Sequence, residues 1–393
     1  MSGADMRPLA PLEKATIEQR LRLMGKFVYA LDEANIHIIK LMHEIGPRNL
    51  LEVARAAGLP PTSVYDRARK LEERFGTLSI ANLDHSRLGL KKCITLVESN
   101  PGMEDYVSEA LAVPNYWKTI MRCEGGFTHY ALHAIPENRT REFENYMAET
   151  KRAGLVRKYE AVWVTDYHYA FPNFQLYDSE NRSWSFEWNR WSNLVKEKER
   201  AKAICDPSCY SIQADRTDLL ILSRLEVNAR TKFSETSKLL GITLQAVKHR
   251  YDKRIIPRGL IREFIINVLP YPPELSDIYE ILLTFEDEEG MNNFFGASEE
   301  MFPILRTVKV LDETKLGVRM YCPRSETGRF FAMLSGFARA GLVSDYSAVR
   351  VRLETQSRQT ISAELFDENG WKYEPSQHLA TLDSIVQNAK VSL

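Results

Sequence analysis

A stretch that occurs twice decides the fold of this chain: RAGLVRKYEAVWV at residues 152–164 and RAGLVSDYSAVRV at residues 339–351. Nine of the thirteen positions are identical, at an offset of 187 residues. The match continues upstream at the same offset in the aligned pairs Pro136 and Pro323, Thr140 and Thr327, and Phe143 and Phe330. Identity of this extent is far beyond chance and indicates an internal repeat, which sets the interpretation of every other pattern.

The repeat extends to the front of each copy. There the offset is 183 residues, and it aligns the pairs Asp32 and Asp215, Ile38 and Ile221, Gly58 and Gly241, Arg67 and Arg250, and Gly76 and Gly259. The change of offset from 183 to 187 requires only four extra residues in the second copy. One unit of about 150 residues, followed by a tail, is therefore present twice.

The composition is that of a globular protein. The chain has 393 residues, of which 44% are hydrophobic and 27% charged, enough apolar surface for several cores. It has no apolar run long enough to span a membrane and no secretory signal at its start. Its five cysteines are an odd number, which argues against a disulfide framework. We expect a cytoplasmic protein without cofactor or membrane partner, and its net charge of −1 permits a local DNA-binding surface.

The first third of each copy has the pattern of a winged helix-turn-helix. In the first copy, apolar residues recur at helical spacing after Asp32, and a third helix is expected at residues 62–75. Gly58 suits the turn between the second and third helices because glycine adopts positive φ without strain. Residues 77–80 alternate like a strand and form the expected wing. The second copy repeats this order, with helices expected at residues 218–226, 233–240 and 243–255 and a strand at 260–268.

The third helix of each module is the expected DNA-recognition helix. Such a helix fits the major groove, where polar side chains reach base edges and Lys or Arg neutralise phosphates. The candidate DNA-binding residues are Thr62, Ser63, Tyr65, Arg67, Arg69, Lys70, Thr243, Gln245, Lys248, His249, Arg250 and Lys253. Residues 32–82 hold seven Lys/Arg and seven Asp/Glu, whereas residues 215–267 hold eleven Lys/Arg and six Asp/Glu. The second module is therefore expected to make more of the phosphate contacts.

Alternatives remain for these helices. Arg67 and Arg250 occupy matching positions and could brace their modules instead of contacting phosphate. Asp66, together with Glu72 and Glu73, opposes phosphate binding by the first module. A three-helix module with surface lysines is also typical of protein-interaction domains.

The remaining part of each copy predicts a split βαβ domain. In the first copy the expected order is βαββαβ, with strands at residues 90–98, 116–123, 127–135 and 155–164 and helices at 104–111 and 140–153. Helices then cover one face of the sheet, and the second copy of the domain is the simplest cover for the other face. The expected fold class is α+β, with two winged helix-turn-helix modules alternating with two βαββαβ ferredoxin-like domains.

This combination resembles the Lrp/AsnC family of prokaryotic transcription regulators. The resemblance is carried by residues 32–80 and 215–261 and continues into the sheet domains, so that it covers residues 31–168 and 215–354. It implies paired sheet domains, helix-turn-helix modules that bind palindromic double-stranded DNA, and amino-acid-like effectors at the interfaces between sheet domains. It also implies a homodimer.

The expected effector loop departs from the family pattern. The family usually has a Gly-x-x-Asp loop before its third strand, whereas the first copy reads Gly125-Gly126-Phe127-Thr128-His129 and the second lacks the glycines. Gly125, Gly126, Thr128 and His129 are therefore candidates for an altered effector site. An ordinary hairpin turn is the alternative.

A second resemblance is to siroheme decarboxylases, which have the same two-part architecture. Arg122, His129 and His133 could serve such an enzyme, and buried structural histidines are the alternative. The sequence shows no carboxylate pair, nucleophile elbow or phosphate loop, and Cys205 and Cys209 form an isolated CxxxC. We therefore predict no catalytic residue and no metal site, and we expect that the chain is not an enzyme.

The remaining segments flank or connect these domains. Trp184, Trp188 and Trp191 have the spacing of one helical face and are expected to dock on the sheet or on the neighbouring copy. Residues 376–391 are expected to form a terminal helix that is exchanged between chains. The predicted boundaries are 1–30 (N-terminal helical extension), 31–84 (first winged module), 85–168 (first sheet domain), 169–214 (Trp-rich tail and linker), 215–268 (second winged module), 269–354 (second sheet domain) and 355–393 (C-terminal tail).

The sequence as a whole predicts a DNA-binding transcription regulator of Lrp/AsnC type, in which the sheet domains set the spacing of the modules. The expected partners are double-stranded DNA, a second copy of the chain and a small-molecule effector. The alternatives are a siroheme-decarboxylase-like enzyme and a ligand-binding or scaffold protein that does not bind DNA.

Overall fold

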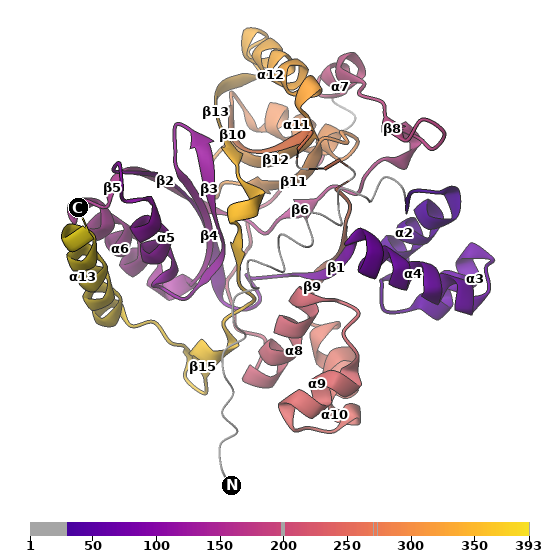
Figure 1. Cartoon of the computed structure of the whole chain (residues 1–393), viewed down its shortest axis with the longest axis horizontal. Helices are drawn as coiled ribbons and strands as arrows, with labels where there is room; N and C mark the ends of the chain where they lie inside the picture. The colour runs from indigo at the N-terminus through magenta and orange to yellow at the C-terminus, as the bar shows by residue number, and fades with distance from the viewer. Residues whose placement is uncertain (1–29, 198–200, 270, 273, 393) are drawn as a thin grey trace.

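The computed structural model describes residues 30–392, apart from 198–200, 270 and 273. The helix predicted for the N-terminal extension lies outside the described residues. In Figure 1 the helical modules occupy the lower right of the molecule, and the sheet domains lie above them and to the left. The structure belongs to the mixed α+β class that the sequence predicted.

Module 1 (residues 31–83) is a compact group of helices followed by a strand. Its elements are α2 (Glu33–Ile45), α3 (Leu50–Ala57), α4 (Pro61–Phe75) and β1 (Leu78–Leu83). The side chain of Asp32 caps α2 by accepting a hydrogen bond from the N–H of Asn35. Gly58, with a φ of 64°, ends α3 in the left-handed conformation that the turn requires.

Module 2 (residues 215–268) repeats this order. Its elements are α8 (Arg216–Val227), α9 (Phe233–Leu240), α10 (Leu244–Arg250) and β9 (Ile261–Asn267). Thr243 caps α10 by accepting a hydrogen bond from the N–H of Ala246. Beyond Arg250 the helix widens into a π-helical turn, Tyr251–Ile255, so the predicted third helix is not uniformly α-helical.

The sequence predicted a separate wing within each module, and the pairing of β1 with β9 shows that this prediction is wrong. The two strands pair antiparallel with each other, with Ile80 opposite Ile265, and so form a two-stranded ribbon between the two copies (Figure 1). An unpaired strand edge must find a partner for its backbone groups, and here the matching strand of the repeat supplies it. The ribbon therefore connects the two modules.

The two sheet domains have the same internal order of elements. Sheet domain 1 (residues 90–164) contains β2 (Leu90–Ser99), α5 (Glu104–Ala112), β3 (Trp117–Gly125), β4 (His129–Pro136), the 3₁₀ turn η2 (Glu137–Arg139), α6 (Thr140–Arg152) and β5 (Val156–Val164). Sheet domain 2 (residues 276–351) contains β10 (Ser276–Phe285), α11 (Glu288–Ser298), β11 (Ile304–Lys309), β12 (Lys315–Pro323), α12 (Arg324–Arg339) and β13 (Val343–Val351). The strand order β5-β2-β4-β3 continues as β13-β10-β12-β11 because β3 pairs with β13.

The two sheet domains bury a common apolar core. It takes Ile94, Leu96, Met121, Tyr130 and Leu132 from sheet domain 1 and Ile278, Leu282, Val308, Tyr321 and Val349 from sheet domain 2. Gly317 permits the close approach, since a β-carbon there would lie 2.8 Å from Cγ2 of Val308 and 3.7 Å from Cδ1 of Ile94. The second copy thus covers the open sheet face of the first, as the sequence predicted.

The tail of the first copy packs on sheet domain 2. It contains β6 (His168–Tyr169), which pairs with β11, then η3 (Phe174–Leu176), β7 (Tyr177–Asp178), β8 (Ser183–Trp184) and α7 (Trp188–Leu194). Trp184 stacks on Phe302, and Trp188 lies edge-on to Phe330. The docking on the neighbouring copy is confirmed, but Trp184 lies in a strand and not on the helix that holds Trp188 and Trp191.

The tail of the second copy packs on sheet domain 1. It contains η6 (Leu353–Thr355), β14 (Ser357–Arg358), η7 (Ala363–Leu365), β15 (Phe366–Asp367), β16 (Gly370–Trp371) and α13 (Pro375–Ser392). The helix α13 lies against α5 and α6. The predicted terminal helix is present, and within this chain it is exchanged between the two copies. None of the helices described here is both long enough and apolar enough to cross a membrane.

Candidate nucleic-acid interface and central cavity

The helix α10 and the π-helical turn after it present basic side chains to solvent. Gln245, Lys248, His249 and Lys253 are exposed, whereas Val247 on the opposite face is buried. None of the four exposed side chains has a hydrogen bond or ion pair with another residue in the described part of the chain. Lys248 and Lys253 are thus free to contact an external anion such as a DNA phosphate.

Arg250 and Arg67 are held inside their own modules. Arg250 donates to both carboxylate oxygens of Asp215 and to Oδ1 of Asp218, each at 2.8 Å, and the Asp218 side chain is fully buried. Arg67 pairs in the same way with Asp32 at 2.9 Å. Both aspartates at positions 32 and 215 cap the first helix of their module. These contacts fit the bracing role that the sequence left open, and we leave both arginines out of the proposed DNA contacts.

The helix α4 offers fewer free cations than α10. Asp66 lies in the middle of its exposed face and pairs with Arg69 at 2.8 Å and with Lys70 at 3.7 Å. Its first turns place three polar side chains at least partly in solvent: Thr62, Ser63 and Tyr65. The surface of α4 is therefore less positive than that of α10.

Direct contacts fix the two modules to each other. Arg48 of module 1 donates hydrogen bonds to the carbonyls of Ala229 and Thr231, and its guanidinium lies 3.9 Å from the centre of the Phe233 ring. From module 2, Arg230 pairs with Glu72 of α4 at 2.9 Å. The distance between the two candidate recognition helices is therefore set within one chain.

The candidate effector loop lies at the seam between the two sheet domains. Gly125 pairs with Val349 of β13 and has a φ of 122°, a conformation that favours glycine. Gly126 has open space around its α-carbon. Oγ1 of Thr128 accepts a hydrogen bond from the N–H of Ser99. The loop thus has a structural role at the seam, and its effector role remains a prediction.

His129 and His133 are buried against α5. Nε2 of His129 lies 2.9 Å from the carbonyl oxygen of Glu104, and Nε2 of His133 lies 2.9 Å from that of Leu111. Burial lowers the pKa of both imidazoles to about 4, so both are neutral near pH 7 and donate from Nε2 to these carbonyls. Arg122 pairs with Asp105. The structure thus gives all three residues partners within sheet domain 1.

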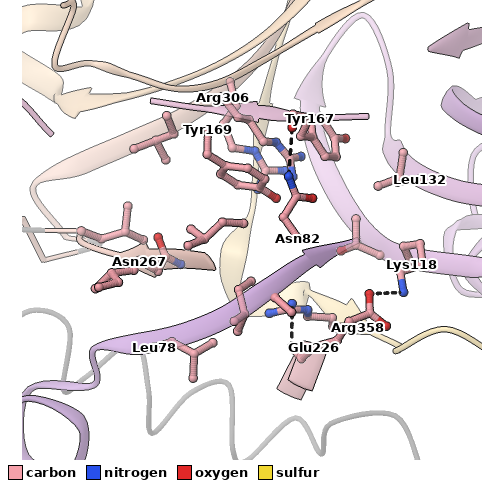
Figure 2. A pocket seen from close by; sticks show the side chains of 18 of the residues that line it. Leu78, Asn82, Lys118, Leu132, Tyr167, Tyr169, Glu226, Asn267, Arg306 and Arg358 are labelled. Atoms are coloured by element: carbon pink, nitrogen blue, oxygen red, sulfur yellow. Dashed lines mark hydrogen bonds and ion pairs between the residues drawn. The ribbon is translucent and has the colours of Figure 1, made fainter. Parts of the chain in front are cut away.

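A cavity of about 220 Å³ lies where the ribbon, α8, both sheet domains and both tails meet. We call it the central cavity. Its polar wall comes from segments far apart in the sequence: His85, Lys92, Lys118, Tyr167, Tyr169, Glu226, Arg306, Arg319, Gln356 and Arg358. Figure 2 shows Arg306 beside Tyr167 and Tyr169, and Lys118 and Arg358 gathered around Glu226. No local motif links these residues, and sequence reasoning missed all of them.

At one end of the cavity, Lys118 and Arg358 converge on Glu226. Nζ of Lys118 lies 2.7 Å from Oε1 of Glu226, and Arg358 donates to the backbone carbonyl of Glu226 at 3.3 Å. Burial lowers the pKa of Lys118, although Glu226 opposes this change, and the positive charges of Arg358 and Lys92 add to the lowering. Positive charge is therefore crowded at this end.

A second carboxylate, Asp166, lies next to this group. Asp166 accepts a hydrogen bond from Nδ1 of His85 at 2.8 Å and pairs with Nζ of Lys92 at 3.0 Å. Burial opposes ionisation of Asp166, yet Lys92 and His85 hold the pKa of this carboxyl well below its usual range. Nε2 of His85 is buried and has no partner among the described residues.

The other end of the cavity is built around Glu280. Arg306 and Arg319 both pair with this one carboxylate, Arg306 at 3.0 Å. The guanidinium of Arg306 also lies 3.8 Å from the centre of the Tyr167 ring, and its Nη2 donates to the hydroxyl of Tyr130 at 3.3 Å. Nε of Arg306 is buried without a partner among the described residues.

Residues that could hold a metal do not gather in the described structure. Among residues 30–392 with the stated gaps, no group of three or more His, Cys, Asp or Glu side chains is placed to bind a metal ion. Cys205 and Cys209 are exposed free thiols. Asp206 between them pairs with Lys309 at 2.7 Å and so fixes this linker to sheet domain 2.

Comparison with known proteins adds a full-length fold match. No family model matches the sequence. The solved structure of the siroheme decarboxylase NirDL covers 91% of this chain and 100% of its own, with a TM-score of 0.55 and 12% identity. The same enzyme in complex with an iron-uroporphyrin III analogue gives a TM-score of 0.52. This chain therefore has the overall fold of that enzyme over most of its length.

Shorter matches are to transcription regulators. The chain is 32% identical over 77 residues to an uncharacterised helix-turn-helix transcriptional regulator of Pyrococcus furiosus, a stretch that is 20% of this chain. The chain spans about half the length (51%) of that relative. An AsnC family regulator from Agrobacterium tumefaciens covers 34% of this chain at 15% identity, with a TM-score of 0.28.

The full-length match overturns one prediction. The sequence was expected to be that of a non-enzyme because it lacks catalytic motifs, but an enzyme has this fold over nearly the whole chain, so that exclusion is wrong. The error has a physical cause: local motifs reveal only sites built from neighbouring residues. The wall of the central cavity contains His85, Lys118 and Arg306, which come together only in the folded chain.

Proposed function

We propose that this chain is a DNA-binding transcription regulator whose main phosphate contacts come from module 2. The observation that carries the proposal is the exposed face of α10 and the following turn, where Lys248 and Lys253 have no internal partner among the described residues. Partner-free lysines on a recognition helix supply the sequence-independent part of DNA affinity. The match to a helix-turn-helix regulator over part of the chain supports the same function.

Sequence preference would come from polar groups on the same face. Thr243, Gln245 and His249 are exposed at the start and on the outer face of α10, where a docked helix meets base edges. The corresponding face of α4 carries Thr62 and Tyr65 and a central acidic residue, Asp66. The two modules present different surfaces at a fixed separation, so the proposed DNA site has two unlike halves.

A salt titration of DNA binding tests the proposal. Binding of the full chain to selected double-stranded DNA is measured by fluorescence anisotropy, with wild type compared to the double variant Lys248→Ala, Lys253→Ala. Loss of two phosphate contacts should weaken binding about tenfold or more and flatten the slope of log K against log salt by about 1.8 units.

The matched control carries the same charge change on another surface. Lys151→Ala with Lys390→Ala removes two exposed lysines from α6 and α13, and its binding should equal that of wild type. Equal binding by both double variants, or no selected DNA sequence from a random pool, would refute the assignment of α10.

The fold match favours a second candidate, a decarboxylase that acts on a tetrapyrrole. NirDL, whose fold this chain shares, is named for siroheme decarboxylation. The purified chain is incubated with siroheme without oxygen, with heat-denatured chain as the control. Product masses lower by whole carbon dioxide units would support this activity, whereas unchanged siroheme without a shift of its absorbance would exclude it.

A further inference from the structure

We infer that the central cavity binds a small dianion with two separated anionic groups, such as a dicarboxylate or a small phosphorylated acid. The cavity lies apart from the exposed face of α10 and from the seam that holds Gly125 and Thr128. The inference is independent of DNA binding as such. Its regulatory consequence, given below, rests on the proposed function.

The charge around the cavity favours an anion at each end. At the Glu280 end, Arg306 and Arg319 share a single carboxylate. At the other end, Lys92 pairs with Asp166 and Lys118 with Glu226, whereas Arg358 donates to a backbone carbonyl and has no ion pair with a carboxylate among the described residues. Each end thus has a cation that does not have a carboxylate partner of its own among the described residues. Buried charge without compensation is costly, so an anionic group at each end would stabilise the folded chain.

An unpartnered buried donor marks a place where such a ligand would bond. Nε of Arg306, in a side chain 7% exposed, has no partner in the part of the chain that is described. Arg306 lines the cavity. Buried polar atoms in native proteins are almost always bonded to protein or to water. A carboxylate or phosphate oxygen would satisfy the N–H of Arg306 with a charge-assisted hydrogen bond.

The size of the cavity limits the ligand. Its volume of about 220 Å³ is below the range of about 300–1,000 Å³ that is typical of pockets for drug-sized ligands. A dicarboxylate of a few carbons fits this space, whereas a tetrapyrrole with its carboxylate side chains is several times larger. The volume of the cavity therefore favours a small acid over a tetrapyrrole.

The walls of the cavity connect such a ligand to the DNA-binding modules. Ile80 and Asn82 of β1 and Ile266 of β9 line it, so the ribbon that joins the modules forms one side. Glu226 lies in the last turn of α8, and its carboxylate also accepts a hydrogen bond from the N–H of Ile361 at 2.6 Å. An anion that competes with Glu226 for Lys118 would change the packing of α8. If module 2 binds DNA as proposed, occupancy should change its DNA affinity.

Binding is tested on the full chain without DNA. Succinate, citrate, inorganic phosphate and pyrophosphate are compared with acetate by calorimetry and thermal unfolding, at an ionic strength held constant with sodium chloride. A dianion should raise Tm and bind at least tenfold more tightly than acetate. Comparison of the carboxylates with the phosphates identifies the anionic group. Equal effects of all the salts would overturn the inference.

Variants locate the bound anion. Arg358→Gln should weaken binding at least tenfold, and Gln356→Glu, which places a carboxylate on the cavity wall, should weaken it further. The control is Arg352→Gln, because Arg352 lies six residues earlier, pairs with Glu354 at 2.8 Å and does not line the cavity. Each variant must retain the wild-type circular dichroism. Equal dianion affinity of Arg358→Gln, Gln356→Glu and wild type would overturn the site.

DNA titrations with and without the best dianion test the regulatory part. A changed DNA affinity in wild type, absent in Arg358→Gln, supports it, and an unchanged affinity overturns it. A chain that binds the dianion but no DNA sequence refutes the proposed function and leaves the cavity site standing, so the two failures are distinguishable.

Discussion

The basic side chains of module 2 divide into two groups with different roles. Arg250 and Arg254 are directed inward and share the carboxylates of Asp215 and Asp218. Lys248 and Lys253 are exposed and have no partner in the described structure. The planar guanidinium can bond two carboxylates at once, whereas a lysine ammonium is a flexible point charge suited to phosphates. Module 2 therefore has fewer cations available to DNA than its excess of Lys/Arg over Asp/Glu indicates.

The first prediction concerns these bracing arginines. Arg250→Ala leaves the fully buried Asp218 with Arg254 as its remaining cationic partner and should destabilise module 2 by about 2 kcal/mol. Arg67→Ala removes a pair with Asp32, whose side chain is 57% exposed, and should cost less than about 1 kcal/mol. Hydrogen exchange of the amides in α8 and α2, respectively, measures the two changes.

An equal loss of amide protection in Arg250→Ala and Arg67→Ala would contradict the prediction. The prediction rests on the burial of Asp218, the partner of Arg250, compared with the exposure of Asp32, the partner of Arg67. The sequence could identify the matching positions of Arg67 and Arg250 because the repeat aligns them. It could not decide between phosphate contact and bracing. That decision depends on where Asp32 and Asp215 lie in space, 35 residues earlier in each copy.

At the scale of elements, the structural features that depend on neighbouring residues could be predicted from the sequence. The left-handed turn at Gly58 and the βαββαβ order both follow from local sequence. The partner of β1 was not predictable in this way. An alternating pattern predicts a strand, but it does not indicate which other strand pairs with it. The same reasoning applies to the tails. Periodicity indicates the helix α13, but only the fold shows that it packs on the first copy.

The second prediction tests the exchange of α13. Leu382 is 2% exposed and lies in the core of sheet domain 1, so Leu382→Ala should destabilise that domain by about 2–5 kcal/mol. Leu379→Ala on the same helix is the matched control, since Leu379 is 39% exposed and should cost little. Hydrogen exchange should show lost protection in α5 and α6 and unchanged protection in α11 and α12. The reverse pattern would place the helix on the second copy and refute the exchange.

At the scale of the whole molecule, each of the two large apolar cores combines parts of both copies. One core joins module 1 and the first tail to sheet domain 2. The other joins module 2 and the second tail to sheet domain 1. The central cavity lies between these two cores. Because its wall is built from segments of both copies, no single segment of the sequence indicated it. Its wall takes Lys118 from one copy and Arg306 and Arg358 from the other.

This arrangement predicts that neither copy folds alone. A chain divided between residues 200 and 201 separates module 1 from sheet domain 2 and α13 from sheet domain 1, which leaves apolar faces such as those of Ile39 and Leu382 without cover. Each fragment expressed by itself should aggregate or lack cooperative unfolding.

The two fragments expressed together should co-purify in equal amounts. Light scattering of the complex should give the mass of the undivided chain, 45.3 kDa, or twice that value if the predicted homodimer forms. The undivided chain is the reference for both outcomes. Soluble fragments that each unfold cooperatively as monomers would show that the cores are independent, contrary to the packing described above.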